Sequence, residues 1–255
     1  MPVALYPSLE DKTVIITGGA SGIGAALVES FVLQGAKVAF LDLNHQAGAL
    51  LANRLSELGK HAPAAFQCDL TDLDALQACL DEAIDALGGA VDVLVNNAAN
   101  DDRHEVGQIT PEYWDNRMAV NLRHQFFCIQ AVLPGMKAKG YGSVINLGSI
   151  SWHLGLENMP LYITAKAGIS GMTRALARDL GSDGIRVNCI VPGAVKTERQ
   201  MQLWTTPESE REILDQQCLN ERIEPHHVAA MALFLAAEDS AMCTGHEYFV
   251  DAGWK

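Results

Sequence analysis

The sequence predicts an α/β fold in which one doubly wound, parallel sheet of about seven strands is flanked by helices. The main observation is an alternation of two periodicities. Short runs rich in β-branched residues at 13–17 and 37–42 are each followed by a longer segment of helical spacing, near 22–34 and 45–59. A strand–helix order of this kind makes successive strands parallel and places helices on the faces of the sheet.

Five further strand candidates continue this alternation, at 64–68, 92–96, 143–147, 186–191 and 247–250. No linker rich in Pro, Gly or Ser and no internal repeat divides the chain, so a single domain over 1–255 is expected.

The longest stretch without a strand signal follows the sixth strand, and 198–217 within it is polar and helical. Late excursions of this kind commonly cover the ligand crevice of a doubly wound sheet. We therefore expect a substrate-covering segment around 194–220.

The composition excludes several classes of partner. The formal net charge is -13, whereas binding a nucleic acid needs clustered Lys and Arg. The six cysteines are scattered without a C-x-x-C pair, which favours reduced structural thiols over disulfides or a metal site. No apolar run approaches the ~20 residues that span a bilayer, and the first residues lack a signal-peptide pattern. We expect a folded, cytoplasmic protein with no metal, nucleic acid or membrane partner.

A glycine-rich turn, TGGASGIG, joins the first strand to the first helix. Gly18 permits a tight turn, Gly22 lets the backbone approach a pyrophosphate, and Gly24 permits close packing of the helix on the sheet. The helix N-terminus adds N–H donors. Such turns also occur without ligands, but the position between strand and helix favours dinucleotide binding, with Ser21 and Ile23 in the same loop.

Asp42 ends the second strand about 20 residues further on, where a carboxylate can accept hydrogen bonds from both hydroxyls of an adenosine ribose. The same charge would repel a ribose 2′-phosphate, and the neighbouring Ala20 and Leu43 bring no cation. NAD is therefore expected rather than NADP. Asn44 and His45 leave NADP open, since either can bond a 2′-phosphate if Asp42 turns away. The alternative for Asp42 is an ordinary turn acid.

Tyr162 and Lys166 lie four residues apart near the start of a helix predicted to end near residue 180, so they share one face. Such a pair alone is common on solvated helices. It is accompanied here by the glycine-rich turn and by Asn96-Asn97-Ala98, Asn121, Ser149 and Pro192-Gly193 followed by Thr197. Over essentially the whole chain, this combination resembles the short-chain dehydrogenase/reductase family.

The resemblance implies a Rossmann-type oxidoreductase in which Tyr162 takes the proton of a substrate hydroxyl while hydride passes from the same carbon to the nicotinamide. Lys166 would hold the nicotinamide ribose and lower the tyrosine pKa, whose reference value of about 10 suits a base poorly at neutral pH. Ser149 would bond the reacting oxygen, and Asn121 would position a water for proton exit. Plainer roles stay open: Ser149 as a strand-end cap and Asn121 as a core amide.

The same resemblance assigns further residues to the cofactor groove. Asp69 and Leu70 would contact the adenine, and Thr197 the carboxamide. Ala99 stands where the family usually has glycine, which matters if that backbone needs a positive φ. The residues expected to bind the cofactor are Gly18, Ser21, Gly22, Ile23, Gly24, Asp42, Asp69, Leu70, Asn96, Ala98, Tyr162, Lys166, Pro192, Gly193, Val195 and Thr197.

Two segments that follow the fourth and fifth strands are expected to contact the substrate: 100–104, NDDRH, and 149–156, SISWHLGL. Their carboxylates, amides, imidazoles and indole suit a ligand with several hydroxyls and a C–H face, such as a sugar. The alternatives are a solvated charged loop at 101–104 and simple loop packing for Trp152. The residues expected to bind substrate are Asn100, Asp101, Ser149, Ser151, His153 and Tyr162.

Five segments, NNAxNDDRH, VNLRH, GSISWHLGL, CTGHEY and DAGW, further resemble the bacterial aldose 1-dehydrogenases within that family. This implies oxidation of an aldose, a pentose such as D-xylose or L-arabinose, at its anomeric hydroxyl to an aldonolactone. D-Galactose and L-fucose stay open. The alternatives are a family member acting on a secondary alcohol or 3-oxoacyl substrate, and a non-catalytic NAD-binding protein.

The family resemblance also implies a homotetramer in which the helices around Asn121 and Lys166 pair between subunits. The sequence adds one indication, since Trp254 follows the last strand and an aromatic side chain there favours burial.

Overall fold

The computed structural model of the chain describes residues 4–254. In this range one sheet contains seven strands: β1 Thr13–Thr17, β2 Lys37–Asp42, β3 Ala64–Gln67, β4 Val93–Asn96, β5 Gly142–Leu147, β6 Ile185–Pro192 and β7 Glu247–Val250. The α-helices are α1 Gly22–Leu33, α2 His45–Leu55, α3 Leu73–Ala86, α4 Pro111–Met118, α5 His124–Lys139, α6 Ile150–Leu154, α7 Pro160–Leu180, α8 Glu198–Leu203, α9 Pro207–Gln216 and α10 Pro225–Ala236.

The strands are all parallel, in the order β3-β2-β1-β4-β5-β6-β7. The chain thus moves outward from β1 to β3 and then crosses back, so that β4 lies on the other side of β1. In doubly wound sheets, ligands bind beyond the carboxyl ends of the strands at this reversal of direction.

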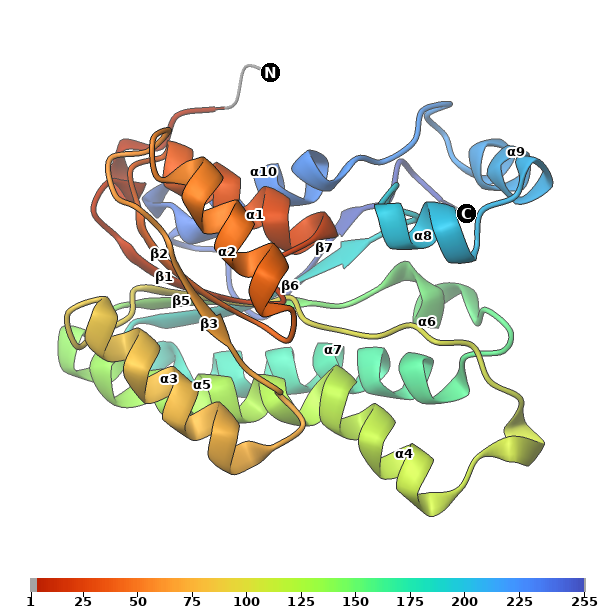
Figure 1. Cartoon of the computed structure of the whole chain (residues 1–255), viewed down its shortest axis with the longest axis horizontal. Helices are drawn as coiled ribbons and strands as arrows, with labels where there is room; N and C mark the ends of the chain where they lie inside the picture. Colours follow the sequence, from red (N-terminus) through yellow and green to blue (C-terminus); the bar gives the residue numbers. More distant parts are fainter. Residues whose placement is uncertain (1–3, 255) are drawn as a thin grey trace.

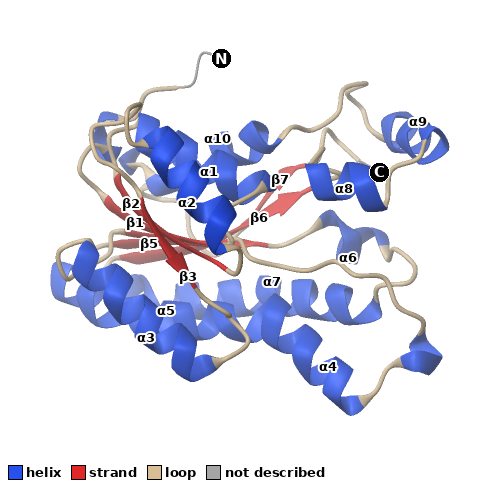
Figure 2. Cartoon of the chain, viewed as in Figure 1, coloured by secondary structure: helices blue, strands red, loops and turns tan. Residues whose placement is uncertain are grey.

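Helices cover both faces of the sheet, with α1, α2 and α10 on one and α3, α5 and α7 on the other (Figure 1). Figure 2 shows the sheet between these two layers. The side chains of β1 alternate accordingly: Val14 and Ile16 pack under α1 and α10, and Ile15 packs toward α3 and α5. Because strand side chains alternate, a continuous apolar run fills both cores.

The seven predicted strands are confirmed, each with bounds within one residue of the prediction. The helical stretch predicted over 198–217 is instead two helices, α8 and α9. Pro207 begins α9, and Thr206 before it is extended, with φ -114° and ψ 163°. A residue that precedes proline disfavours the helical conformation, which explains the break.

The segment containing α8 and α9 lies at the same end of the sheet as α6 and the loop that follows β4 (Figure 1). No helix within residues 4–254 is long and apolar enough to cross a membrane.

Candidate active site

A cavity of about 1230 Å³ opens at the carboxyl ends of the strands. Residues that follow β1 to β6 line it, together with residues of α7, α8 and α9. Cavities for single small ligands occupy roughly 300 to 1,000 Å³. The cavity therefore has room for a dinucleotide and a small substrate together.

The glycine-rich turn after β1 forms one end of this cavity. Gly18 has a φ of +66°, and a Cβ on Gly24 would lie 1.7 Å from the Gly18 carbonyl oxygen. Ser21 begins α1 without a side-chain cap hydrogen bond, so the first N–H groups of α1 receive no acceptor from it. Uncapped N–H groups and the helix dipole together favour an anion at this point.

Asp42, at the end of β2, lies in the cavity wall next to this turn. Its two carboxylate oxygens accept hydrogen bonds from the backbone N–H groups of Ala20 and Asn44, each at 2.9 Å. These bonds fix the carboxylate and tie the turn to β2. The Asn44 side chain is engaged as the N-cap of α2, where it accepts a hydrogen bond from the Ala47 N–H.

Tyr162 and Lys166 lie in the first two turns of α7, and both line the cavity. The Lys166 ammonium lies 5.3 Å from the centre of the Tyr162 ring and donates a hydrogen bond to the Leu147 carbonyl oxygen at 2.7 Å. Only 1% of Lys166 is exposed. The end of β5 therefore fixes a buried ammonium group beside the tyrosine.

Burial governs the ionisation of both groups. It lowers the pKa of Lys166 to about 8 and raises the pKa of Tyr162 above its ordinary value. The Asp101 carboxylate raises the Tyr162 pKa further, whereas a hydrogen bond with Ser149 and the charge of Arg103 lower it. In the chain by itself burial outweighs the contacts that lower the Tyr162 pKa, and a further positive charge in the cavity would lower it.

Ser149 and Asn121 both have local structural contacts. The Ser149 hydroxyl caps α6 by accepting a hydrogen bond from the Ser151 N–H at 3.2 Å, and it lies 2.8 Å from the Ser151 hydroxyl. Asn121 lies in a π-helical stretch between α4 and α5. Its amide accepts a hydrogen bond from the Asn100 N–H at 2.8 Å and donates one to the Asn100 carbonyl at 3.0 Å. Asn121 thereby anchors the loop after β4.

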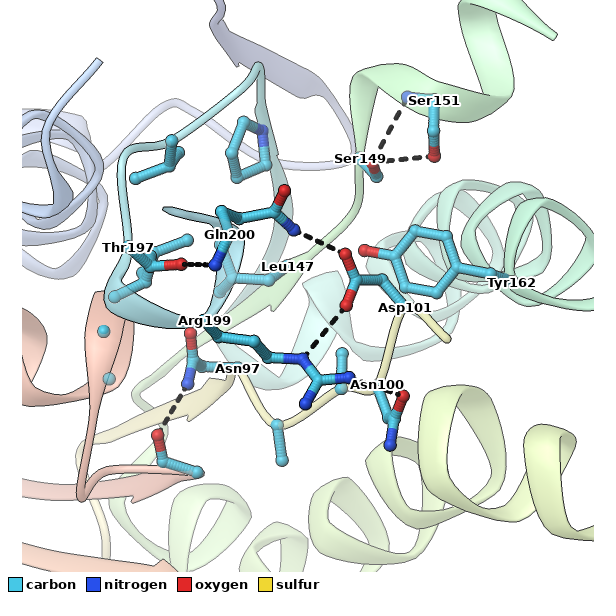
Figure 3. A pocket seen from close by; sticks show the side chains of 18 of the residues that line it. Asn97, Asn100, Asp101, Leu147, Ser149, Ser151, Tyr162, Thr197, Arg199 and Gln200 are labelled. Atoms are coloured by element: carbon cyan, nitrogen blue, oxygen red, sulfur yellow. Dashed lines mark hydrogen bonds and ion pairs between the residues drawn. The ribbon is translucent and has the colours of Figure 1, made fainter. Parts of the chain in front are cut away.

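That loop is also joined to α8 across the cavity (Figure 3). Arg199 pairs with Asp101 at 3.3 Å and with Asp102 at 2.6 Å, and Gln200 donates a hydrogen bond to Asp101. The Asp101 side chain is only 16% exposed. At this residue, the alternative of a solvated charged loop is wrong.

Most of the predicted site residues line this one cavity. They are Gly18, Ser21, Gly22, Ile23, Gly24, Asp42, Asp69, Leu70, Ala98, Asn100, Asp101, Ser149, Ser151, Tyr162, Lys166, Pro192, Gly193, Val195 and Thr197.

Asn96, Asn121 and His153 are not among the lining residues. Asn96 lies in the core of the sheet, where its amide donates hydrogen bonds to the Asn146 side chain at 3.0 Å and to the Gln125 carbonyl at 3.3 Å. The next residue, Asn97, lines the cavity instead and donates hydrogen bonds to the carbonyls of residues 17 and 18.

The side chain of His153 lies near β7. Its Nε2 is 3.5 Å from the Glu247 carboxylate, and its ring packs against those of Trp152 and Phe249. The structure therefore does not bring His153 to the other predicted substrate contacts, and Trp152 has the packing role that was its alternative.

The cavity is also lined by residues that the sequence analysis did not single out for the site, among them Arg199, Gln200, Trp204, Gln216 and Trp254. The indole N–H of Trp254 donates a hydrogen bond to the Gln216 side chain at 2.7 Å. The first four of these lie in the predicted covering segment, 194–220, whose polar and aromatic residues could have indicated them.

Ala99 does not need to be glycine. Within residues 4–254, the non-glycine residues with positive φ are Asp11, Asn158 and Ala252. The backbone at Ala99 is therefore accessible to any residue.

Comparison with known proteins agrees with this architecture. A family profile described as enoyl-(acyl carrier protein) reductase matches residues 18–255. The chain is 57% identical to D-xylose 1-dehydrogenase of Caulobacter vibrioides, with 100% of both chains covered. It is 46% identical to the probable galactose dehydrogenase GalD of Rhizobium meliloti, over 99% of this chain and 98% of that protein.

A solved structure of a 3-oxoacyl-[acyl-carrier protein] reductase with bound NAD, from Brucella melitensis, superposes with a TM-score of 0.88 at 33% identity. The match covers 98% of this chain and 93% of that one. The chain therefore belongs to the short-chain dehydrogenase/reductase family, and it is an oxidoreductase of that type. The predicted Rossmann-type fold class is confirmed.

Proposed function

We propose that this protein is an aldose 1-dehydrogenase, which oxidises a cyclic aldose at its anomeric carbon to the aldonolactone. The observation that carries the proposal is the 57% identity, over the whole chain, to the D-xylose 1-dehydrogenase of Caulobacter vibrioides. The name of the second relative, a probable galactose dehydrogenase, supports the same class of substrate. D-Xylose is the first candidate, and L-arabinose, which differs from it in the orientation of one hydroxyl, is the second.

The residues at the cavity fit a nicotinamide dinucleotide. The glycine-rich turn is a cradle that a Cβ on Gly24 would obstruct, and the first turn of α1 has N–H donors for a pyrophosphate. Asp42 is held where it can accept hydrogen bonds from a ribose, and Asp69 and Leu70 line the wall after β3, near the expected adenine.

The bound dinucleotide would supply a hydride acceptor and a positive charge at the nicotinamide. Tyr162 would accept the proton of the anomeric hydroxyl at its phenolic oxygen, with the Ser149 hydroxyl bonded to the same sugar oxygen. Lys166, fixed by the Leu147 carbonyl, would stabilise the tyrosinate by its charge and hold ribose hydroxyls. Asn121, which anchors Asn100, would hold a water through its remaining hydrogen-bonding capacity.

We propose NAD rather than NADP as the cofactor. Asp42 cannot readily turn away, because Ala20 and Asn44 hold both of its oxygens. The Asn44 side-chain oxygen caps α2, and its NH2 group, the only part left to donate to a 2′-phosphate, carries no charge to offset the repulsion from Asp42. The relative from Brucella melitensis with bound NAD supports this choice.

The sugar is proposed to bind between Tyr162 and the segment at 194–220. Asp101 and Gln200, which are hydrogen-bonded to each other, can exchange that bond for bonds to sugar hydroxyls. Trp204 and Trp254 line the same cavity and offer flat apolar surfaces for the C–H face of a sugar ring.

A cytoplasmic homotetramer also remains a proposal. The edge strand β7 and helix α5 carry exposed aromatic side chains, Phe249 at 44% and Phe126 at 43%, which favour association. Trp254 does not add to this argument, because its indole is hydrogen-bonded to Gln216 within the same chain.

The proposal is tested by following NADH formation with a panel of aldoses, including D-xylose, L-arabinose, D-galactose and L-fucose, together with a 3-hydroxyacyl thioester. The expected result is turnover with at least one pentose and a lactone as the first product. Turnover with the thioester and none of the sugars would replace aldose oxidation with the acyl alternative.

A further inference from the structure

His104 is the last residue of the NDDRH segment, and its ring contacts the start of the helix that carries Tyr162 and Lys166. The Leu161 N–H donates a hydrogen bond to His104 Nε2 at 3.3 Å, although the two residues are 57 positions apart. This contact belongs to neither the cofactor groove nor the substrate residues described above.

Helix α7 has a particular need for this acceptor. It begins at Pro160, which has no N–H, and its N-cap residue Met159 makes no side-chain cap hydrogen bond. Leu161 therefore carries the first N–H of the helix. The opening N–H groups of a helix have no intrahelical partner and need one from elsewhere. His104 supplies it from a loop that is distant in sequence.

The tautomer of His104 follows from this contact. A backbone N–H can only donate, so Nε2 must be unprotonated and the ring neutral, with its proton on Nδ1. Nδ1 lies 3.2 Å from the Asp102 carbonyl and 3.2 Å from the Tyr113 hydroxyl, and both oxygens can accept that proton. The Tyr113 ring also packs edge-on against the imidazole.

His104 fixes one end of a loop whose other end Asn121 fixes at Asn100. The His104 backbone N–H strengthens the anchor by donating to the Asn158 carbonyl at 2.8 Å. Between the two anchors lie Asp101 and Arg103, both in the cavity wall. The charges of these two residues act on Tyr162 in opposite directions.

We propose that His104 is a positioning residue, whose neutral imidazole caps α7 at Leu161 and so holds the loop of Asp101 and Arg103 at a fixed distance from Tyr162. The inference rests on the proposed role of Tyr162 as the proton acceptor. It predicts that an acceptor at the Nε2 position, rather than the imidazole as such, is what the enzyme requires.

A matched pair of variants separates these possibilities. In His104→Gln, the side-chain amide oxygen can reach the Nε2 position, whereas the shorter side chain of His104→Asn reaches only the Nδ1 position. Amide hydrogen exchange of segment 160–166, measured without any sugar, reports directly on the hydrogen bond that caps α7. Exchange should be about tenfold faster in His104→Asn and close to wild type in His104→Gln.

Steady-state kinetics with an aldose that the wild-type enzyme oxidises measure the effect of the cap on catalysis. We expect kcat to fall about tenfold in His104→Asn and to recover to within about threefold of wild type in His104→Gln. The dissociation constant of NADH should change less than about twofold in both, because the glycine-rich turn and Asp42 follow β1 and β2 and do not depend on His104. Unchanged exchange in His104→Asn, or equal losses in the two variants, would overturn the proposal. If wild type oxidised none of the aldoses while the exchange difference held, the cap would be supported and the aldose substrate refuted.

Discussion

At the scale of single residues, the candidate site consists of groups whose ionisation depends on where the backbone holds them. Lys166 is the clearest case. A buried ammonium is unfavourable unless it is hydrogen-bonded, and the Leu147 carbonyl provides that bond at 2.7 Å. The ammonium remains within 5.3 Å of the Tyr162 ring centre, where its charge favours the tyrosinate.

Replacing Tyr162 by Phe should nearly abolish sugar oxidation while NADH still binds, because only the phenolic oxygen is lost and the ring still packs. Steady-state kinetics and NADH fluorescence titration provide the two measurements. A variant that retained more than roughly a tenth of the wild-type rate, a loss of only ~1.4 kcal/mol in the barrier, would exclude Tyr162 as the principal base.

Replacing Lys166 by Ala should impair two properties at once. Turnover should fall at least about a hundredfold, and NADH should bind several-fold more weakly, since one ammonium is proposed to serve both the tyrosine and the ribose. The variant Tyr162→Phe is the control, because it should affect turnover alone. An NADH affinity equal to that of wild type would contradict the ribose contact.

Replacing Asp42 by Asn should shift cofactor preference. The negative charge is removed, while a side-chain oxygen remains to accept the hydrogen bond from Ala20 or Asn44. We expect the ratio of kcat/KM with NADP to that with NAD to rise about tenfold or more. A wild-type enzyme that already used NADP as well as NAD would refute the role given to Asp42.

His124, buried on α5, should make folding stability depend on pH. Burial lowers its pKa from 6.5 to about 4. Between these two values the unfolded chain binds more protons than the folded chain, so acidification favours unfolding. Stability should fall as the pH drops from 6.5 toward 4, by up to roughly 3 kcal/mol from this residue.

Urea unfolding across this pH range, on wild type and His124→Met, measures that contribution. The variant keeps a side chain of similar volume without the titrating group. It should show a flatter dependence on pH, and parallel profiles for the two proteins would contradict the assignment.

At the scale of elements, the site depends on how closely the first turn of α1 approaches the sheet. Gly24 has no room for a side chain, since its Cβ would lie 1.7 Å from the Gly18 carbonyl. A side chain at Gly24 would push α1 away from the sheet, and the N–H groups of its first turn would move away from the dinucleotide groove.

The substitution Gly24→Ala should therefore abolish NADH binding and lower the melting temperature. Gly48→Ala, on helix α2, is the matched control, because a Cβ there meets Ala65 and Phe40 only at an ordinary contact distance of 3.5 Å. Because alanine favours a helix over glycine by roughly 0.5 to 1 kcal/mol, that variant should be as stable as wild type or more so. Similar NADH affinities for Gly24→Ala and wild type would contradict the steric argument.

The strands were predictable from the sequence, whereas the break between α8 and α9 was not. The strands were predictable because a strand buried on both faces is a short run of mainly apolar, β-branched residues, as β1 is. The break between α8 and α9 was indicated by Pro207 but was not predicted, because the polar helical spacing continues on both sides of it.

Contacts between distant segments were not predictable in the same way. Asn96 and Asn97 both lie at the end of a predicted strand, so the sequence alone does not show which of them faces the cavity. Their orientation depends on hydrogen-bond partners distant in sequence, Asn146 for Asn96 and the glycine-rich turn for Asn97. His153 was assigned to the substrate because it follows β5, but α6 directs its side chain toward Glu247 on β7. Local sequence does not contain this information.

At the scale of the whole molecule, one cavity receives residues from both halves of the sheet, so the site exists only when the complete sheet is assembled. Asp42 belongs to the half before β4, and Tyr162 belongs to the half after it. The exposed aromatic side chains on α5 and β7 lie away from the lining of this cavity. They are available for contacts with further copies of the chain.

The proposed homotetramer predicts a light-scattering mass near four times that of the 27.5 kDa chain. Replacing Phe126, which is 43% exposed on α5, by Glu should lower the oligomeric state, because a charge would be buried at the proposed contact. A wild-type mass of a single chain would refute assembly. A tetramer unaffected by the substitution would place the contact elsewhere.

The central claim is that hydride leaves the anomeric carbon of an aldose bound next to Tyr162. D-Xylose carrying deuterium at C1 tests it most directly, with the reduced cofactor and the sugar product analysed by mass spectrometry after turnover. The account predicts that the deuterium appears in NADH and that the first sugar product is the unlabelled lactone. Deuterium retained in the sugar while NADH forms unlabelled would contradict it, because oxidation would then occur at a different carbon.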